Sequence, residues 1–116
     1  MSEARELVKT VYEALSEKKA EDIKIIDISG LTVVADYFII ATGNSVSQVN
    51  ALVDNVEEKL LEKKCQLKTK EGAASGGWVL MDFGDIIVHI FDRDKRLFYD
   101  LERIWRDGVE IDSSDI

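Results

Sequence analysis

A tryptophan, the only histidine of the chain and two aspartates at a hinge occur in one short segment, GGWVLMDFGDIIVHIFDRD, residues 76–94. Asp82 and Asp85 flank a Phe-Gly hinge between two apolar runs, and His89 follows in the second run. Carboxylates and imidazole are metal ligands, whereas an indole is a frequent anchor in protein interfaces. The segment is therefore a candidate for a metal site, a catalytic site or a binding surface.

The residues that a metal centre or a familiar catalytic motif requires are missing from the sequence. One histidine, one cysteine and the pair Asp82 and Asp85 do not make a convincing ligand set, although Asp85 and His89 could share a strand. Residues 82–84 spell the kinase magnesium motif, but the sequence has no kinase glycine-rich loop, strand lysine or catalytic loop. No Gly-x-Ser-x-Gly of a serine hydrolase occurs either. We therefore predict no metal, no cofactor and no catalysis.

Nucleotidyl transfer is the one enzyme class that stays open as an alternative. Such enzymes combine a Gly-Ser helix start with strand carboxylates that hold Mg²⁺, and Thr42-Gly-Asn-Ser45 with Asp82 and Asp85 loosely imitates this arrangement. The two carboxylates, however, have the D-x-x-D spacing of a turn and do not alternate along a strand. Ser45 and Gln48 also form an S-x-x-Q capping box, which accounts for this loop as a helix start.

The charge balance points away from nucleic acids. The chain has 15 Lys plus Arg against 23 Asp plus Glu, a formal net charge of −8. Such a protein is repelled by phosphate backbones, so direct nucleic-acid binding is disfavoured as a primary contact and basic proteins are favoured as partners. The alternative is that the charge only keeps the domain soluble.

Cysteine content and hydropathy indicate a cytoplasmic protein. The single cysteine, Cys65, cannot form an internal disulfide, as is usual in a reducing compartment. The chain opens with Met-Ser-Glu-Ala-Arg-Glu, not with the apolar segment of a signal peptide. No apolar run is long enough to span a membrane.

Apolar periodicity predicts three helices. Residues 3–18 carry an apolar stripe at helical spacing, and a second helix runs from Ser45 to about Lys63. A last helix spans about 94–106, with Phe98 and Trp105 in its apolar stripe and Tyr99 outside it, and Gly108 is a plausible stop.

Short apolar runs between glycines predict the strands. A first strand spans 22–28, and the nearly unbroken apolar run 36–43 predicts a central strand covered on both faces. Residues 64–69 are a candidate edge strand, and 71–77 are a candidate mobile loop because they contain three glycines. The order of elements predicts one α/β domain over residues 1–108, a mixed sheet with flanking helices, followed by an acidic frayed tail over 109–116.

The segment 78–91 predicts a β-hairpin with two different faces. A tight turn centred on Phe83-Gly84 pairs Asp82 with Asp85, Leu80 with Ile87 and Trp78 with His89. One face is aliphatic and suits the core: Val79, Met81, Ile86, Val88 and Ile90. The other mixes aromatic, apolar and acidic residues: Trp78, Leu80, Asp82, Asp85, Ile87, His89 and Phe91. The mixed face is a candidate binding surface, and the alternative is that helices cover both faces.

Several motifs together resemble one family. They are Asp36-Tyr-Phe-Ile-Ile-Ala-Thr-Gly43, Glu71-Gly72, Trp78, Asp82-Phe-Gly-Asp85, Val88-His-Ile-Phe91 and Arg96-Leu-Phe-Tyr-Asp-Leu-Glu-Arg-Ile-Trp105. In this order they resemble the ribosomal silencing factors, RsfS or Iojap, from the first helix to about Asp107. The departures are Phe83, where the family usually has Tyr, and Leu97, which interrupts the family's tighter Arg-x-Phe-Tyr pattern.

The resemblance implies both a fold and a function. It implies an α/β fold related to nucleotidyltransferases but without known catalysis, and homodimers off the ribosome. It also implies binding to the large ribosomal subunit through its fourteenth-numbered protein, a basic protein near the subunit interface. A factor bound there blocks joining of the small subunit and slows translation when nutrients are scarce.

The mixed face of the hairpin is the expected contact surface for this partner. We expect apolar contacts from Trp78, Leu80, Ile87, His89 and Phe91. Asp82 and Asp85 are expected to pair with Lys or Arg of the partner. Tyr99 could reach the partner or a second copy of the chain from the last helix.

Overall fold

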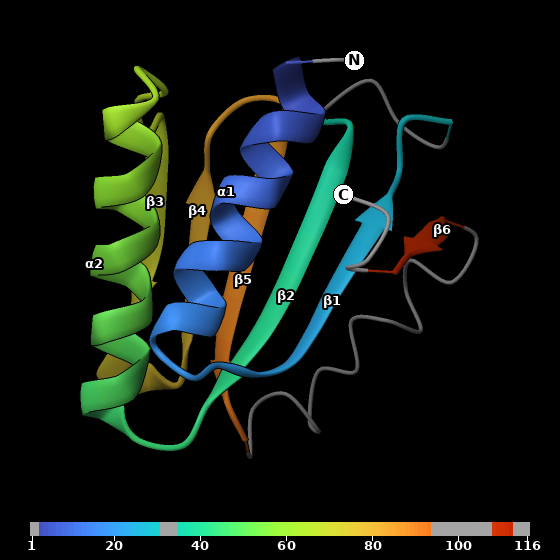
Figure 1. The fold of residues 1–116 in the computed structure, drawn as a ribbon. Coiled ribbons are helices and arrows are strands. Elements are labelled where there is room, and N and C mark those ends of the chain that lie inside the picture. Colours follow the sequence, from blue (N-terminus) through green and yellow to red (C-terminus); the bar gives the residue numbers. More distant parts are fainter. Residues whose placement is uncertain (1–2, 31–34, 94–107, 113–116) are drawn as a thin grey trace.

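The computed structural model describes residues 3–30, 35–93 and 108–112. This part of the chain forms a mixed six-stranded sheet with two helices packed on one face, so the predicted single α/β domain is confirmed (Figure 1). The elements in chain order are α1 (Glu3–Glu17), β1 (Glu21–Asp27), β2 (Tyr37–Gly43), α2 (Val46–Glu62), β3 (Thr69–Ala73), the 3-10 turn η1 (Ala74–Gly76), β4 (Trp78–Asp82), β5 (Ile86–Asp92) and β6 (Val109–Ile111).

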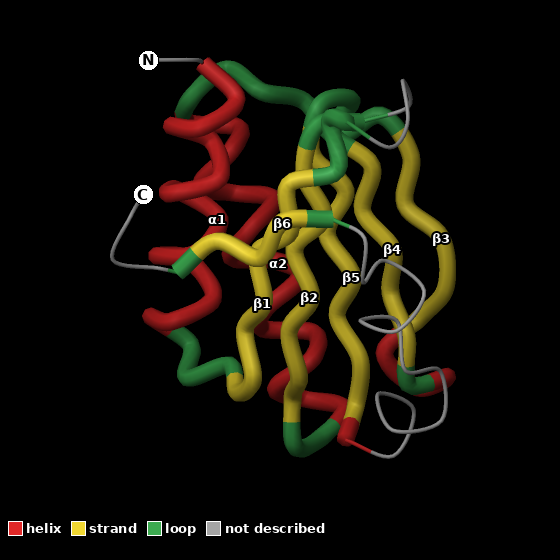
Figure 2. The backbone as a smooth tube through the Cα atoms, turned by 90° about the vertical axis from the view of Figure 1, so that its right-hand side faces the viewer, coloured by secondary structure: helices red, strands yellow, loops and turns green. Residues whose placement is uncertain are grey.

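The sheet order places the hairpin strands next to the most buried strand. The strands follow one another as β3-β4-β5-β2-β1-β6, with β2 parallel to β5 and the other neighbouring pairs antiparallel (Figure 2). All seven residues of β2 are buried, which confirms the central strand predicted from its unbroken apolar run. Strand β5 therefore lies in the interior of the sheet, while β4 is separated from the edge only by β3.

Both described helices cover the same face of the sheet and contact each other (Figure 1). Apolar residues at helical spacing are buried on both, with Val8, Val11 and Leu15 on α1 and Val49, Leu52, Val53, Val56 and Leu60 on α2. Leu7 and Tyr12, which belong to the same stripe of α1, are partly buried. The buried Asn55 Nδ2 donates to the carbonyl oxygen of Ala14 at 2.8 Å, which ties the two helices together. In the described ranges no helix is long and apolar enough to cross a membrane.

The two faces of the sheet carry separate apolar clusters. The first, under the helices, contains all five residues of the predicted core face: Val79, Met81, Ile86, Val88 and Ile90. The second lies on the face away from α1 and α2 and contains Ile26, Ile28, Ala35, Phe38, Ile40, Ile87 and Phe91, with Trp78 and Leu80 packed against it. The prediction that the hairpin separates an aliphatic core face from a mixed face is confirmed.

The edge strand lies further along the chain than predicted. It spans Thr69–Ala73 and not 64–69, because residues 63–65 still close the end of α2 through backbone hydrogen bonds to Leu60 and Leu61. The predicted mobile loop over 71–77 is therefore wrong for its first three residues. Gly72 has φ +84°, and a Cβ there would stand 2.2 Å from the carbonyl oxygen of Trp78, so this strand needs glycine to approach β4.

Part of the predicted frayed tail belongs to the sheet. Val109–Ile111 form β6, which pairs antiparallel with β1 at the edge opposite β3. Glu110 and Lys24 add an exposed ion pair with an N–O distance of 3.4 Å. The predicted last helix with Phe98, Tyr99 and Trp105 falls outside the described residues.

Gly43 is expected to be required for the packing of α2 against β2. A Cβ at this position would lie 2.8 Å from Cγ2 of the buried Val49 and 3.2 Å from its backbone nitrogen. We therefore expect Gly43→Ala to lower the free energy of unfolding by about 1–2 kcal/mol in urea denaturation, since overpacking forces the neighbours apart. Gly30→Ala is the matched control, because a Cβ at Gly30 meets nothing within 4 Å. Equal stabilities of the two variants would contradict this account.

Candidate partner-binding site

The hairpin has the predicted faces but a different register. Trp78 pairs with Phe91, Leu80 with His89 and Asp82 with Ile87, so the predicted pairs of Trp78 with His89, Leu80 with Ile87 and Asp82 with Asp85 are wrong. Each partner is displaced by two residues, and because side chains alternate along a strand, a displacement of two leaves every side chain on its predicted face.

The turn consists of Gly84 and Asp85 and is closed by a hydrogen bond from Phe83 N to Ile86 O at 2.9 Å. Gly84 has φ +97°, which suits glycine as the first residue of a two-residue loop. The Asp82 carboxylate accepts from Gly84 N at 2.8 Å, and the Asp85 carbonyl accepts from Asp36 N at 2.8 Å. The two aspartates are therefore not opposed across the ladder, and the unfavourable like-charge contact that such a pair would make does not arise.

Four aromatic rings contact one another on the mixed face. The indole of Trp78 stacks on the ring of Phe91, with centroids 5.4 Å apart and planes 11° apart. The imidazole of His89 stacks beside both rings and also contacts Phe38 from β2, at a centroid distance of 4.8 Å. Rings from three neighbouring strands thus form one cluster, defined here as Trp78, His89, Phe91 and Phe38.

His89 is a buried, neutral histidine. Its side chain is only 4% exposed, and burial lowers its pKa from the ordinary value of 6.5 to about 4, since the apolar surroundings disfavour the charged imidazolium. Its Nδ1 accepts a hydrogen bond from Trp78 Nε1 over 3.2 Å. The imidazole is therefore uncharged at neutral pH and acts as an acceptor toward the indole.

The predicted contact residues divide into a buried and an accessible group. Ile87, His89 and Phe91 on β5 are 8%, 4% and 0% exposed, so in this conformation they support the face from within the structure. The accessible group consists of the half-buried Trp78, Leu80 and Asp82 and the exposed Asp85. Tyr99 lies outside the described residues. The accessible group extends along β4, from the indole of Trp78 at the open end of the hairpin through Leu80 to the two carboxylates at the turn, and about 13 Å of strand separate Trp78 from Asp82.

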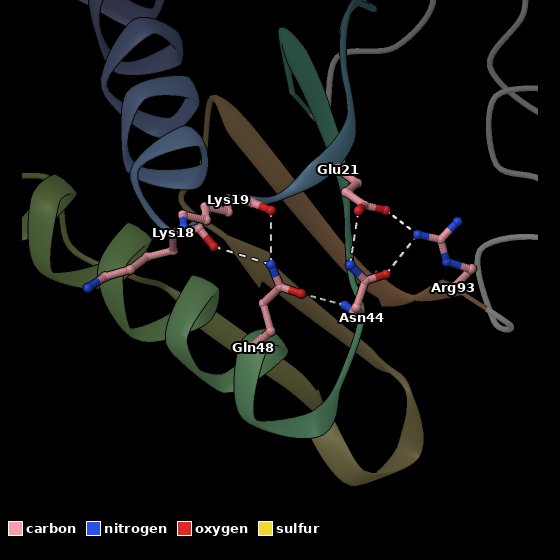
Figure 3. A network of polar contacts seen from close by, with 6 residues as sticks. All are labelled: Lys18, Lys19, Glu21, Asn44, Gln48 and Arg93. Carbon is pink, nitrogen blue, oxygen red and sulfur yellow. Dashed lines mark hydrogen bonds and ion pairs between the residues drawn. The ribbon is translucent and has the colours of Figure 1, made fainter.

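A polar network that sequence reasoning missed lies at the end of the sheet away from the hairpin turn (Figure 3). The Arg93 guanidinium pairs with the Glu21 carboxylate and donates to Asn44 Oδ1, and Asn44 Nδ2 donates to Glu21 Oε1 at 3.0 Å. Gln48 donates to the carbonyl oxygen of Lys19 at 2.9 Å. These residues are up to 72 positions apart in the sequence, so no local pattern indicates that they meet.

This network and the capping hydrogen bonds of α2 involve the loop Thr42-Gly-Asn-Ser45, which resembles the Gly-Ser helix start of nucleotidyltransferases. Ser45 Oγ accepts from Gln48 N at 3.1 Å, as the capping box predicts, and Gln48 Oε1 accepts from Asn44 N at 2.6 Å. Gly43 pairs with Asp92 at one end of the parallel β2–β5 pair, and Tyr37 pairs with Ile86 at the other.

The Gly-Asn-Ser loop and the carboxylates of Asp82 and Asp85, the two parts of the nucleotidyltransferase-like pattern, are consequently far apart. Six residue steps along β2 put about 20 Å between the Gly43 end and the hairpin turn with Asp82 and Asp85. These carboxylates and the Gly-Asn-Ser loop cannot act on one substrate atom. Over residues 3–30, 35–93 and 108–112, no group of three or more His, Cys, Asp and Glu side chains is arranged to hold a metal ion.

Comparisons with known proteins all lead to the same kind of protein. A family model described as "Ribosomal silencing factor during starvation" matches residues 1–116. The ribosomal silencing factor RsfS of Bacillus subtilis is 41% identical over 104 residues, which cover 90% of this chain and 88% of that protein. The chloroplastic protein Iojap of Arabidopsis thaliana is 34% identical over 97 residues, covering 84% of this chain and 40% of the plant protein.

Solved structures agree with the described fold. A crystal structure of a protein from Chromobacterium violaceum has a TM-score of 0.86 and 41% sequence identity, and covers 90% of this chain and 87% of its own. A second one, from Bacillus halodurans, has a TM-score of 0.82 and 33% identity, and covers 93% of this chain and 98% of its own. The similarity thus extends over nearly the whole chain in both sequence and structure.

Proposed function

Because the chain belongs to the ribosomal silencing factor family, we propose that it binds the large ribosomal subunit through the subunit's fourteenth-numbered protein and keeps the small subunit from joining. Translation regulation and association with the ribosome follow from the family. The proposed protein contact and the proposed block of subunit joining would repress translation in the cytoplasm when nutrients are limiting.

The observation that supports this proposal is the accessible part of the mixed face, which extends along β4 to the hairpin turn. Trp78 and Leu80 are half-buried on the sheet face away from α1 and α2. Asp82 and Asp85 follow at the hairpin turn, four or more residues beyond Trp78 along the chain. An indole with an aliphatic neighbour and a fringe of carboxylates fits a basic protein surface. The formal net charge of −8 adds a long-range attraction to such a partner and a repulsion from exposed RNA.

The proposed mechanism requires no chemical step. A protein bound at the subunit interface occupies volume that the small subunit needs, so the extent of silencing is set by affinity and position. The aromatic cluster supplies rigidity, because rings that already pack together on three strands lose little conformational freedom on binding.

Sedimentation with separated subunits tests the proposal. We expect the protein to migrate with large subunits and not with small ones, and we expect the fraction of joined ribosomes to fall as its concentration rises. Normal subunit joining in the presence of saturating protein that sediments with large subunits would contradict the steric mechanism. Absence of the protein from the large-subunit fractions would contradict the proposed binding itself.

Removing the charge of Asp85 is expected to weaken binding in a salt-dependent way. Its side chain is exposed at the turn, so Asp85→Asn should raise the Kd for large subunits about threefold at low salt and less at high salt. Glu58→Gln is the matched control, since it removes one exposed carboxylate from α2 on the opposite face. Salt titrations of both variants measure this, and equal effects of the two would assign the attraction to net charge alone.

A further inference from the structure

The hydrogen bond between Trp78 and His89 fixes the tautomer of the histidine. An indole Nε1 is a donor only, so Nδ1 of His89 must be the acceptor over the 3.2 Å that separate these atoms. The single proton of the neutral imidazole then lies on Nε2. Because the pKa of His89 is lowered to about 4 by burial, this neutral form is the one present at neutral pH.

The Nε2 atom of His89 is buried and has no hydrogen-bond partner within the described ranges. A buried donor without a partner destabilises the folded state, and a leucine or phenylalanine at this position would avoid that loss. Filling space is therefore a poor explanation for an imidazole here. What distinguishes the imidazole from an apolar side chain is the acceptor that Nδ1 presents to the indole.

The hydrogen bond constrains a motion of the indole that stacking leaves free. Trp78 lies opposite Phe91 in the ladder and stacks on its ring with an interplanar angle of 11°. Two nearly parallel rings can still slide and turn within their planes at little energetic cost. His89 is the diagonal neighbour, two residues before Phe91 on β5, and Phe38 contacts its imidazole from β2. A hydrogen bond to this supported ring fixes the indole within its own plane.

We propose that His89 is a positioning residue that holds the Trp78 indole in one orientation on the partner-binding face. This inference rests on the proposed function, because it assigns His89 a role in that same site. It replaces the expected direct contact between His89 and the partner, which the burial of the imidazole prevents in this conformation. The partner contacts an indole that is already ordered, so binding loses less side-chain freedom.

Three substitutions separate this role from a structural one. His89→Leu removes the acceptor and keeps an apolar side chain, whereas His89→Asn keeps an acceptor at the position of Nδ1. Trp78→Phe removes the donor and keeps an aromatic ring on Phe91. Two quantities are measured: the Kd for isolated large subunits, and the indole Nε1–H resonance of Trp78 in the free protein. That resonance is assigned by its loss in Trp78→Phe, because the chain has a second tryptophan, Trp105.

The expected results are specific to the hydrogen bond. His89→Leu should shift the Trp78 resonance, speed its exchange with solvent and raise the Kd about five- to tenfold, while His89→Asn should leave the Kd within about twofold of the parent. In the Trp78→Phe background, His89→Leu should raise the Kd by less than about twofold, because the donor is already gone. The two histidine variants are compared by thermal melting, and only folded protein is titrated.

Two results would overturn the proposal. One is an unchanged Trp78 resonance and Kd in His89→Leu. The other is an effect of His89→Leu on Kd that is equally large with and without Trp78, because His89 would then act through the fold. The comparison of His89→Leu with and without Trp78 does not use His89→Asn, so it can be made even if His89→Asn does not fold. Failure of the parent chain to bind large subunits would instead contradict the proposed function, and the resonance would still decide whether His89 orders the indole.

Discussion

Replacing Trp78 by alanine is expected to weaken binding to the large ribosomal subunit by about 2 kcal/mol or more, a loss of roughly thirtyfold in Kd. Trp78 has the largest side chain among the accessible residues of the mixed face, and it is half-buried. Its indole is held by stacking on Phe91 and by the bond to His89, so little freedom is lost when a partner covers it. A rigid, half-buried aromatic ring on a face that also carries carboxylates has the properties of an interface hot spot.

Equilibrium titration of labelled protein with purified large subunits measures this effect. The control is Leu61→Ala, which truncates a 57% exposed apolar side chain on α2, on the opposite face, and should leave the Kd unchanged. Truncation of Trp78 also removes contacts to the buried cluster, so circular dichroism and thermal melting must show that the variant is folded at the assay temperature. A folded Trp78→Ala protein that binds as well as the parent would mean that the contact surface lies elsewhere.

The apolar pattern of the sequence correctly predicts those helices and strands that bury a continuous run or stripe of apolar residues. Helices α1 and α2 and strand β2 begin and end within two residues of their predicted bounds, because helical stripes and an unbroken apolar run are local signals. The capping box at Ser45 is local as well, and it marks the start of α2.

The register of the hairpin shows how far turn chemistry limits a sequence-based prediction. Centring the turn on Phe83-Gly84 puts glycine second, whereas the structure puts Gly84 first with φ +97° and Asp85 second. A change of one residue in the turn centre displaces every cross-strand partner by two residues. The faces were therefore predictable from alternation, but the Trp78–Phe91 stack and the diagonal Trp78–His89 bond were not.

The division of the site into buried and accessible residues depends on the order of strands. Ile87, His89 and Phe91 are buried on β5, which lies between β4 and β2, whereas Trp78 and Leu80 are half-buried on β4. Nothing local in the sequence specifies that β5 pairs with β2 or that Val109–Ile111 extends the sheet beyond β1. Both pairings are contacts between distant parts of the chain, and a three-residue strand has too few residues to show a period.

The stability of the folded protein is expected to fall as the pH drops from about 6.5 to about 4 because of His89. In the unfolded chain the imidazole has its ordinary pKa of 6.5, and in the folded chain burial lowers the pKa to about 4. Between these values the unfolded state binds the proton and the folded state does not, so protonation favours unfolding and stability rises with pH through this window. Above pH 6.5 the free energy of unfolding is not reduced by protonation of His89. Near pH 4 this protonation has lowered it by about 3 kcal/mol.

Urea denaturation of the parent and of His89→Leu at pH 7.5 and pH 4 measures the part of the stability loss that is due to protonation of His89. The chain has 23 acidic residues that also titrate near pH 4, but they are shared by both proteins, so the difference between the two pH dependences belongs to His89. We expect the parent to lose about 3 kcal/mol more than the variant over this range. Parallel pH dependences would show that the imidazole is protonated in the folded state.

The same titration has a consequence for the binding face. Protonation puts a hydrogen on Nδ1 and removes the acceptor of the Trp78 indole, so ordering of the indole should be lost together with stability as the pH approaches 4. At neutral pH the imidazole is neutral, and pH changes between 7 and 8 should leave the indole resonance unchanged. A Trp78 resonance that titrates near pH 6.5 would contradict the burial of His89 and, with it, the rigid aromatic cluster on which the affinity of this face depends.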